Sequence, residues 1–280
     1  MSFDRYAVLG NPVAHSRSPF IHAEFARQTG QAMTYERVLC PLGGFAQAAL
    51  DFAAGGGRGC NVTVPFKFEA RQLAARCTER AALAGAANLL RFDEAGWLAD
   101  NTDGIGLVRD IELGAEVSLA GRRVLLVGAG GAAAGVLGPL LAARPAALVL
   151  ANRTVDKARA LVVAHAAWAK TQGVALHAAG LAQPGEGFDV VINARASSLQ
   201  GAPAPVPAAV LRPGTLAVDL MYGAPAEPFL SWARAAGALP RDGLGMLVEQ
   251  AAEAFFVWRG VRPQAAPVLH ALRQRMKAGA

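Results

Sequence analysis

The chain has 280 residues and a mass of 28.9 kDa, which is too long for one small core and favours two domains or one large α/β domain. Hydrophobic residues make up 53% and charged residues 17%, which excludes a disordered chain. The net charge is +6, but the 23 arginines and four lysines form no polybasic run. The composition therefore gives no support to nucleic-acid binding and favours small anions as ligands.

The predicted elements alternate between short strands and helices, a pattern typical of parallel sheets with crossover helices. In the first part of the chain, strands are predicted over residues 6–10, 34–39 and 59–64. Helices are predicted over 18–29, 44–54, 66–76 and 79–84, and a turn-rich stretch over 87–99. Thr102 and Asp103 then open a helix that runs to about residue 113.

The pattern restarts after Gly121, with strands predicted over 124–127, 148–151, 174–177, 190–193 and 216–219. Helices are predicted between the first three of these strands, and a proline-rich loop over 201–213. The chain closes with two predicted helices, 244–259 and 264–277, which have no strand of their own to cover. We therefore expect them to fold back on the first domain, which gives the divisions 1–103, 104–242 and 243–280.

The 20 residues from Val124 to Ala143 carry no charge and are long enough to span a membrane. Gly128, Gly130 and Gly131 separate a strand-like part from a helical part, so a strand, a turn and a helix explain the stretch better, and no membrane partner is expected. The three cysteines have no CxxC spacing, and the start of the chain has no secretory pattern. Both features favour a cytoplasmic protein.

The segment from Gly128 to Ala133 reads GAGGAA and fits the pattern G-x-G-x-x-G/A. In this pattern the first glycine permits a tight turn, and the second lets backbone N–H groups approach a pyrophosphate at the N-terminus of a helix. The motif carries little weight alone in a chain rich in glycine and alanine. Its place between a strand and a helix predicts a dinucleotide site.

The end of the next strand indicates which dinucleotide binds. NAD enzymes usually carry an acidic residue there, which binds the ribose hydroxyls. This chain instead reads Asn152-Arg153-Thr154, with Lys157 one turn further on. A guanidinium forms two hydrogen bonds with a phosphate, so the pattern favours the 2′-phosphate of NADP. A solvated helix start is the alternative explanation of the two cations.

Polar residues in the first part of the chain gather where predicted strands end. Ser16 and Ser18 lie between the first strand and the first helix, and either a ligand or a plain capping loop would explain them. Thr63 and Lys67 follow the third strand, and Asp103 lies at a loop-to-helix junction, where it is ordinarily a cap. A lysine can release a proton when desolvated, whereas an arginine cannot, so chemistry is one explanation of Lys67 and chance is the other. Because α/β folds bind ligands at strand ends, these residues predict a second site.

Eight motifs run the length of the chain: GNPVAHSRSPFIH, GCNVTVPFK, TERAALAGAANLL, ADNTDGIG, LLVGAGGAAAGVL, NRTVDKA, DLMYG and DGLGMLVEQAAEAF. In this order they closely resemble the shikimate dehydrogenase family. The resemblance implies the reduction of 3-dehydroshikimate to shikimate with NADPH, late in the route to chorismate and the aromatic amino acids. It also implies an α/β fold of two domains, an N-terminal substrate-binding domain and a Rossmann-type dinucleotide-binding domain, with C-terminal helices that return to the first.

The resemblance also implies the roles of individual residues. Lys67 and Asp103 would be the catalytic pair. Ser16 and Ser18 would bind the substrate carboxylate, in a pocket that also contains Thr63, Lys67, Asn88, Asp103, Tyr222 and Gln250. NADP would be bound by Glu79, Gly128, Ala129, Gly130, Gly131, Ala132, Asn152, Arg153, Thr154, Lys157, Leu220 and Gly243. No metal is implied.

The chain departs from the family's pattern in two places. After the strand that precedes the proline-rich loop, the family commonly reads Asn-Ala-Thr, whereas this chain has Arg195 in place of the threonine, then Ala196, and Ser198 where glycine is usual. These changes put the local cofactor contacts in question. Lys157 stands where arginine is usual, which keeps the charge but loses the planar fork.

Two other functions remain open at this point. An NAD-using quinate/shikimate dehydrogenase would be expected to have an acid in place of Arg153. A non-catalytic dinucleotide-binding sensor would have no need of Lys67 and Asp103. The expected partner is a small molecule, shikimate or 3-dehydroshikimate, and the expected state is a monomer or a homodimer.

Overall fold

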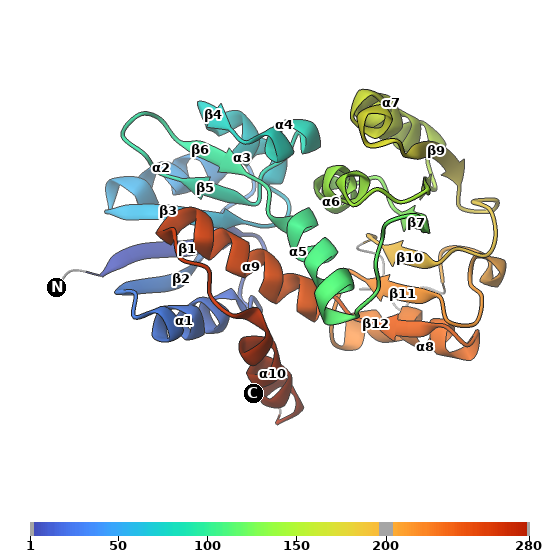
Figure 1. Ribbon diagram of the computed structural model, residues 1–280. Helices are drawn as coiled ribbons and strands as arrows, with labels where there is room; N and C mark the ends of the chain where they lie inside the picture. The colour runs from blue at the N-terminus through green and yellow to red at the C-terminus, as the bar shows by residue number, and fades with distance from the viewer. Residues whose placement is uncertain (1–2, 196–203, 279–280) are drawn as a thin grey trace. The chain divides into compact units, whose positions relative to one another are not determined.

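The computed structural model describes residues 3–195 and 204–278 (Figure 1). The chain divides into two compact units, one formed by residues 1–106 with 247–280 and the other by residues 107–246. Both boundaries lie inside helices, α5 (Asp103–Arg109) and α9 (Leu244–Arg259). No helix in the described part of the chain is long and apolar enough to cross a membrane.

The first unit is built on a mixed sheet with the strand order β2-β1-β3-β5-β6-β4. Its strands are β1 (Asp4–Gly10), β2 (Met33–Leu39), β3 (Gly57–Val62), β4 (Arg76–Cys77), β5 (Leu89–Arg91) and β6 (Leu98–Asp100). β1 is parallel to β2 and β3, whereas β5 is antiparallel to both β3 and β6. The residues just before β5 and just after β6 therefore lie at the same edge as the carboxyl ends of β1 and β3.

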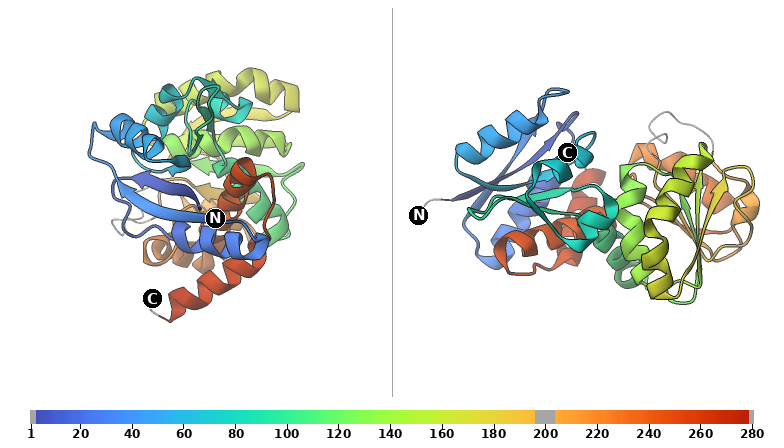
Figure 2. Two further views of the ribbon diagram at one scale, coloured as in Figure 1. Left: turned by 90° about the vertical axis from the view of Figure 1, so that its left-hand side faces the viewer. Right: turned by 90° about the horizontal axis from the view of Figure 1, so that it is seen from above.

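Helices cover both faces of this sheet (Figures 1 and 2). On one face, Phe45 and Phe52 of α2 and Phe66 beside α3 form a core with residues of β1 and β3. On the other face, α1 and α9 pack together, with the rings of Phe25 and Phe255 5.8 Å apart. The predicted return of the C-terminal helices to the first domain is thus confirmed. These helices are α1 (Ser18–Thr29), α2 (Phe45–Ala54), α3 (Lys67–Leu73), α4 (Glu79–Ala84), α9 and α10 (Ala265–Lys277).

The second unit contains a parallel sheet with the strand order β12-β11-β10-β7-β8-β9. Its strands are β7 (Arg123–Val127), β8 (Ala147–Asn152), β9 (Ala175–Gly180), β10 (Val190–Asn193), β11 (Leu216–Asp219) and β12 (Leu239–Arg241). This is the order of the doubly wound Rossmann fold, whose winding reverses between the first and fourth strands, here β7 and β10. Folds of this kind bind ligands outside the carboxyl ends of the strands at that point.

Both faces of the second sheet are buried. α6 (Gly131–Ala142) and α7 (Val155–Gln172) cover one face, where Leu126 and Leu150 belong to the core. α8 (Glu227–Ala235) covers the other face, where Leu125 and Val127 belong to a separate core (Figure 2). The uncharged stretch 124–143 therefore forms β7, the glycine turn and α6, as predicted.

The structure corrects several sequence predictions. The stretch over 87–99 contains β5 and β6, which with three residues each are too short to show an alternating pattern. The sequence pattern also gives no sign of α8 and β12. β12 contains Pro240, which normally interrupts a strand but is tolerated at the edge of a sheet. The helix that opens at Asp103 ends as α5 and continues as a π-helical turn over Asp110–Gly114.

Candidate functional site

Lys67 and Asp103 form an ion pair in the first unit. Lys67 is the first residue of α3 and Asp103 the first residue of α5. The Nζ atom of Lys67 donates to Oδ2 of Asp103 at 2.5 Å, and the two side chains are 17% and 9% exposed. Both follow strand ends at the same edge of the sheet, which is why residues 36 positions apart meet. The pair is mostly buried, with Lys67 the more exposed of the two side chains.

Asn88 holds the aspartate of this pair in place. It lies just before β5, and its side-chain amide donates to Oδ1 of Asp103 at 2.8 Å and to Oγ1 of Thr102 at 2.9 Å. Its side-chain oxygen accepts from the backbone N–H of Thr102 at 2.8 Å. Asn88 is only 2% exposed. Asp103 therefore binds one partner through each carboxylate oxygen, Lys67 and Asn88, which fixes its orientation.

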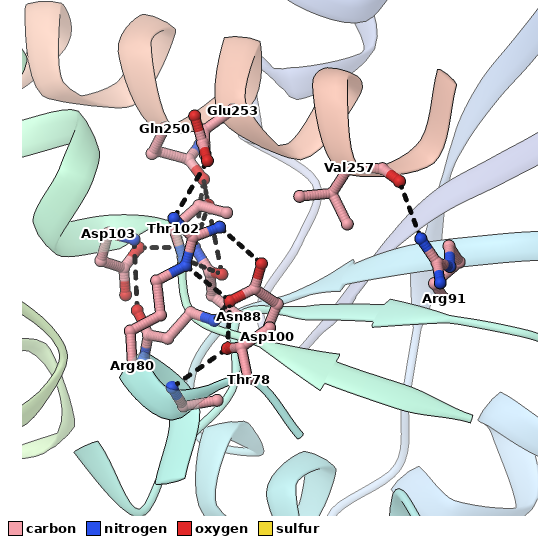
Figure 3. Close-up of polar contacts among 12 residues, drawn as sticks. Thr78, Arg80, Asn88, Arg91, Asp100, Thr102, Asp103, Gln250, Glu253 and Val257 are labelled. Carbon is pink, nitrogen blue, oxygen red and sulfur yellow. Dashed lines mark hydrogen bonds and ion pairs between the residues drawn. The ribbon is translucent and has the colours of Figure 1, made fainter. Parts of the chain in front are cut away.

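Gln250 of α9 joins the same network from the C-terminal part of the chain (Figure 3). Its Oε1 accepts from the amide of Asn88 at 3.2 Å and from the hydroxyl of Thr102 at 3.2 Å, while its Nε2 donates to the carbonyl of Leu247 at 3.0 Å. The structure thus brings Lys67, Asn88, Asp103 and Gln250 into one hydrogen-bonded network. Thr102 was not among the predicted site residues, although it lies inside the ADNTDGIG motif.

A second layer of charges lies behind this network. Arg80 of α4 donates to both carboxylate oxygens of Asp100 at 2.7 and 2.5 Å, and to Glu253 of α9 at 3.0 Å (Figure 3). Arg262 also donates to Glu253. Burial raises the pKa of Glu253, but the hydrogen bonds from Arg262 and Arg80 outweigh burial and leave that pKa below its usual range. Asp100 ends β6 and accepts from the N–H of Asn101 at 2.7 Å, so this layer fixes the chain just before Asp103.

Ser16, Ser18 and Thr63 follow the carboxyl ends of β1 and β3. Ser18 is the first helical residue of α1 and Arg17 is its N-cap residue, and Ser16 Oγ accepts the Ser18 N–H at 3.3 Å. Thr63 donates its N–H to the carbonyl of Leu9 at 2.9 Å. A Cβ atom at Gly10 would lie 2.2 Å from the Thr63 methyl group, so only glycine leaves room for this threonine.

The glycine turn has the geometry that an anion-binding turn needs. Gly128 has φ of +119°, and a Cβ atom there would lie 3.2 Å from the backbone of Ala194. Gly130 has no neighbouring atom within 4 Å of where its Cβ would be, so its backbone is open to a ligand. α6 begins at Gly131, which directs the helix N-terminus toward the turn. The residues present fit the phosphates of a dinucleotide.

A cavity of about 190 Å³ opens beside this turn. It is lined by Ala129, Gly130, Asn152, Arg153, Thr154, Lys157 and Arg195. The structure therefore joins the predicted glycine turn to the predicted cationic segment at the end of β8. Arg195, which the sequence marks only as a departure, lies in the same cavity. Ala196 and Ser198, the other departures at this place, lie outside the described residues.

The remaining predicted residues are distributed over both units. Glu79 is the first residue of α4 in the first unit. Leu220 and Gly243 are neighbours in the second unit, where a Cβ atom at Gly243 would lie 2.2 Å from the Leu220 carbonyl oxygen. Gly243 also donates its N–H to Met221 at 2.8 Å. Tyr222 belongs to the second unit and follows β11.

Three family models match successive parts of the chain. Residues 8–90 match the shikimate dehydrogenase substrate binding domain, residues 112–201 match shikimate / quinate 5-dehydrogenase, and residues 243–273 match the shikimate 5'-dehydrogenase C-terminal domain. Lys67, Asn88 and Gln250 lie inside the matched ranges, whereas Asp100, Thr102 and Asp103 lie between the first two of them.

Known proteins are also similar to this chain over nearly its whole length. A protein of an Acidovorax species named shikimate dehydrogenase (NADP(+)) is 65% identical over 99% of this chain and 98% of its own length. The solved structure of an Ael1 enzyme from Pseudomonas putida is 45% identical, with a TM-score of 0.87 over 96% of this chain and 98% of that one. Shikimate 5-dehydrogenase from Thermus thermophilus, in complex with NADP(H) and shikimate, is 30% identical, with a TM-score of 0.83 over 97% and 99% of the two chains.

Proposed function

The chain belongs to the shikimate dehydrogenase family, and we propose that it catalyses the reversible, NADPH-dependent reduction of 3-dehydroshikimate to shikimate. The observation that carries the proposal is the Lys67–Asp103 pair, oriented by Asn88 at the edge of the first sheet. A non-catalytic sensor would have no reason to keep an ammonium and a carboxylate 2.5 Å apart in a partly buried site.

The ligand roles follow the family resemblance and the geometry of each unit. Ser16 and Ser18 bind the substrate carboxylate, and Thr63, Asn88 and Gln250 line the same pocket. Tyr222 is assigned to the substrate by resemblance alone. The cofactor is held by the turn 128–132, by residues 152–154 with Lys157, and by Glu79, Leu220 and Gly243. We assign residues 1–103 to the substrate domain, 104–242 to the NADP domain and 243–280 to the returning helices.

The chemistry requires one proton and one hydride. NADPH, when bound, supplies the hydride to the ring carbonyl carbon. Lys67 has three N–H donors, of which one is used on Asp103, so another can donate to the carbonyl oxygen of the substrate. As that oxygen becomes a hydroxyl, the Lys67–Asp103 pair delivers the proton, and in the oxidation of shikimate the pair takes it back. Asn88 keeps Asp103 in the orientation in which it holds Lys67.

We also propose that the protein works in the cytoplasm as a monomer or a homodimer. Cys40, Cys60 and Cys77 are free thiols in the structure, which fits a reducing compartment. Sedimentation of the purified protein measures the oligomeric state directly.

The test of the proposed function is a set of four assays with purified protein, in which shikimate or quinate is oxidised with NADP⁺ or NAD⁺. We expect shikimate with NADP⁺ to give the highest kcat/KM. Two charge-assisted contacts from Arg153 and Lys157, reduced by exposure and salt, correspond to a preference for NADP⁺ over NAD⁺ of about 10- to 100-fold. Arg153→Ala should remove most of this preference by weakening NADP⁺ alone. A wild-type enzyme that prefers NAD⁺ and quinate would contradict the proposal.

A further inference from the structure

Arg195 occupies the position in the second unit where a Rossmann fold binds its ligand. It follows β10, and β10 pairs directly with β7, which leads into the glycine turn. The winding of the sheet reverses between these two strands, so residues that follow both of them border the same crevice. The sequence at this place departs from the family's usual threonine.

The backbone around Arg195 is fixed by buried hydrogen bonds. Ala194 donates its N–H to the carbonyl of Val127 at 2.8 Å, which ties this segment to the end of β7. The side-chain amide of Asn193 donates to Asp219 at 2.9 Å, and Asn193 Oδ1 accepts the N–H of Arg195 at 3.4 Å. Asn193 and Asp219 are 3% and 0% exposed. Arg195 is therefore carried by an ordered part of the sheet.

The side chain of Arg195 runs over the glycine turn. Its Cγ atom lies 3.2 Å from where a Cβ atom of Gly128 would be, so the stem of the arginine covers the residue that makes the turn. From there Arg195 lines the cavity together with Arg153 and Lys157. Three side chains from two separate parts of the sequence thus bring positive charge to one cavity.

The lining of this cavity concentrates positive charge. The cavity lining contains three cationic side chains and no acidic one, and none of the three forms an ion pair within the described part of the chain. Nearby Arg159, by contrast, pairs with Asp156 at 2.9 Å. Like charges gathered in this way repel one another, and a doubly charged phosphate monoester would relieve the repulsion and accept hydrogen bonds from each. The 2′-phosphate of NADP is such a group.

We propose that Arg195 is a third ligand of the 2′-phosphate of NADP(H), and that it adds to the preference of this chain for NADP over NAD. The inference rests on the proposed function, because it takes the cavity to be the 2′-phosphate site. The guanidinium does what a threonine hydroxyl at this position cannot, since it brings a permanent charge and a planar fork of donors. It also offsets the loss of the fork at position 157, where lysine stands in place of arginine.

The test measures binding to the intact enzyme without substrate, so that catalysis does not enter. Arg195→Thr, Arg195→Lys and the wild type are titrated calorimetrically with NADP⁺, NAD⁺, 2′,5′-ADP and 5′-AMP. We expect Arg195→Thr to weaken NADP⁺ and 2′,5′-ADP by about tenfold, the factor that corresponds to about 1.4 kcal/mol, and to leave NAD⁺ and 5′-AMP within about twofold. Arg195→Lys should recover part of the loss, and the salt dependence of NADP⁺ binding should become smaller in Arg195→Thr.

Arg159→Ala is the matched control. It removes one guanidinium from the first turns of α7, the helix that carries Lys157, and the side chain of Arg159 does not line the cavity. It should leave all four affinities unchanged. Equal weakening of NADP⁺ and NAD⁺ by Arg195→Thr would overturn the inference in favour of a pyrophosphate or base contact, and no weakening would overturn it outright. Arg153→Ala distinguishes the role of Arg195 from the preference of the whole site for NADP⁺. If Arg153→Ala abolishes the NADP⁺ preference and Arg195→Thr does not, only the inference fails; if the wild type has no preference, the NADP part of the proposed function fails.

Discussion

Lys67 is one of four lysines in a chain with 23 arginines, and the proposed mechanism uses it to transfer a proton. An arginine could hold Asp103 equally well but could not release its proton. The presence of a lysine rather than an arginine therefore points to proton transfer, which the geometry of the ion pair alone does not indicate.

We expect Lys67→Ala to lower kcat by about 10²- to 10⁴-fold, the range usual for an acid–base group, and to change KM for shikimate much less. Lys67→Arg keeps the charge beside Asp103 and serves as the control for electrostatics. Steady-state kinetics of both variants decide between the roles. Near-normal kcat with a raised KM in Lys67→Ala, or normal kcat in Lys67→Arg, would show that Lys67 only binds the substrate.

Ser16 and Ser18 lie at the start of α1, where a serine also has an ordinary structural use. A hydrogen bond to a charged group contributes about 1.5–3 kcal/mol, and a carboxylate far from the reacting carbon changes little between the ground state and the transition state. The double variant Ser16→Ala/Ser18→Ala should therefore raise KM for shikimate by about tenfold or more and lower kcat much less. Thr29→Ala removes a hydroxyl from the other end of the same helix and should leave KM unchanged. If both variants behave alike, the serines serve the helix rather than the substrate.

At the scale of elements, Arg80 connects α4, the end of β6 and α9 through Asp100 and Glu253. Asp100 is 1% exposed, so removing Arg80 would leave a buried carboxylate without its cation, held only by the hydrogen bonds from Thr78 and Asn101. Breaking a buried pair in this way typically costs about 3–5 kcal/mol.

Arg80→Met should therefore lower the free energy of unfolding of the first unit by about 3–5 kcal/mol, as measured by urea denaturation. Arg76 provides the comparison, because its pair with Asp93 is 2.6 Å long but its side chain is 44% exposed. Arg76→Met should cost at most about 1 kcal/mol. Equal losses of unfolding free energy in the two variants would show that the buried Arg80 pair contributes no more to stability than the exposed Arg76 pair.

A cluster of rings joins α1 and α9 to the first sheet, and His22 lies inside it. Its ring stacks on Tyr35 at 4.2 Å and lies 5.4 Å from Trp258. Burial lowers the pKa of His22 from 6.5 to about 3. Below pH 6.5 the unfolded chain therefore takes up a proton that the folded chain refuses, so stability is complete above about pH 6.5 and falls as the pH drops toward 3.

This one group should contribute about 1.4 kcal/mol of lost stability per pH unit over that window. We expect His22→Phe to reduce the slope of unfolding free energy against pH by this amount between pH 5 and 6, where most carboxylates stay ionised. Urea denaturation at several pH values gives both slopes. An unchanged slope in His22→Phe would contradict the assignment.

The elements that the sequence predicts well are those whose pattern repeats within the element itself. α1 and α9 were predicted with the bounds that the structure gives, because each is long enough to show helical spacing. β5 and β6 were not, because three residues carry no period and their place depends on pairing with β3. The role of Arg80 could not be predicted for a similar reason. Nothing in the motif TERAALAG shows that Arg80 binds Asp100 and Glu253, and Glu253 lies 173 positions away in the sequence.

The contacts within the candidate site also depend on residues that are far apart in the sequence, so the sequence alone could not predict them. Lys67, Asn88, Asp103 and Gln250 could be named from family motifs, yet only the structure shows that Asn88 binds both Asp103 and Thr102. Arg195 was visible only as an unusual residue. Its neighbours in the cavity come from β8 and the helix that follows, a connection that depends on how the sheet is ordered.

At the scale of the whole molecule, the first unit is discontinuous in the sequence. Residues 247–280 complete it, and they supply Gln250 to the polar network and the ring of Phe255 to the face that carries α1. The second unit, residues 107–246, is a single continuous segment.

This arrangement sets an order for events on the ribosome. Residues 1–106 emerge first but wait for α9 until the whole second unit has been made, which at ordinary elongation rates takes on the order of ten seconds. During that interval Phe25 lacks the ring of Phe255, against which it packs in the folded chain. The second unit can close before the first does, and Asn88 and Thr102 acquire Gln250 as a partner only after residues 107–246 have been made.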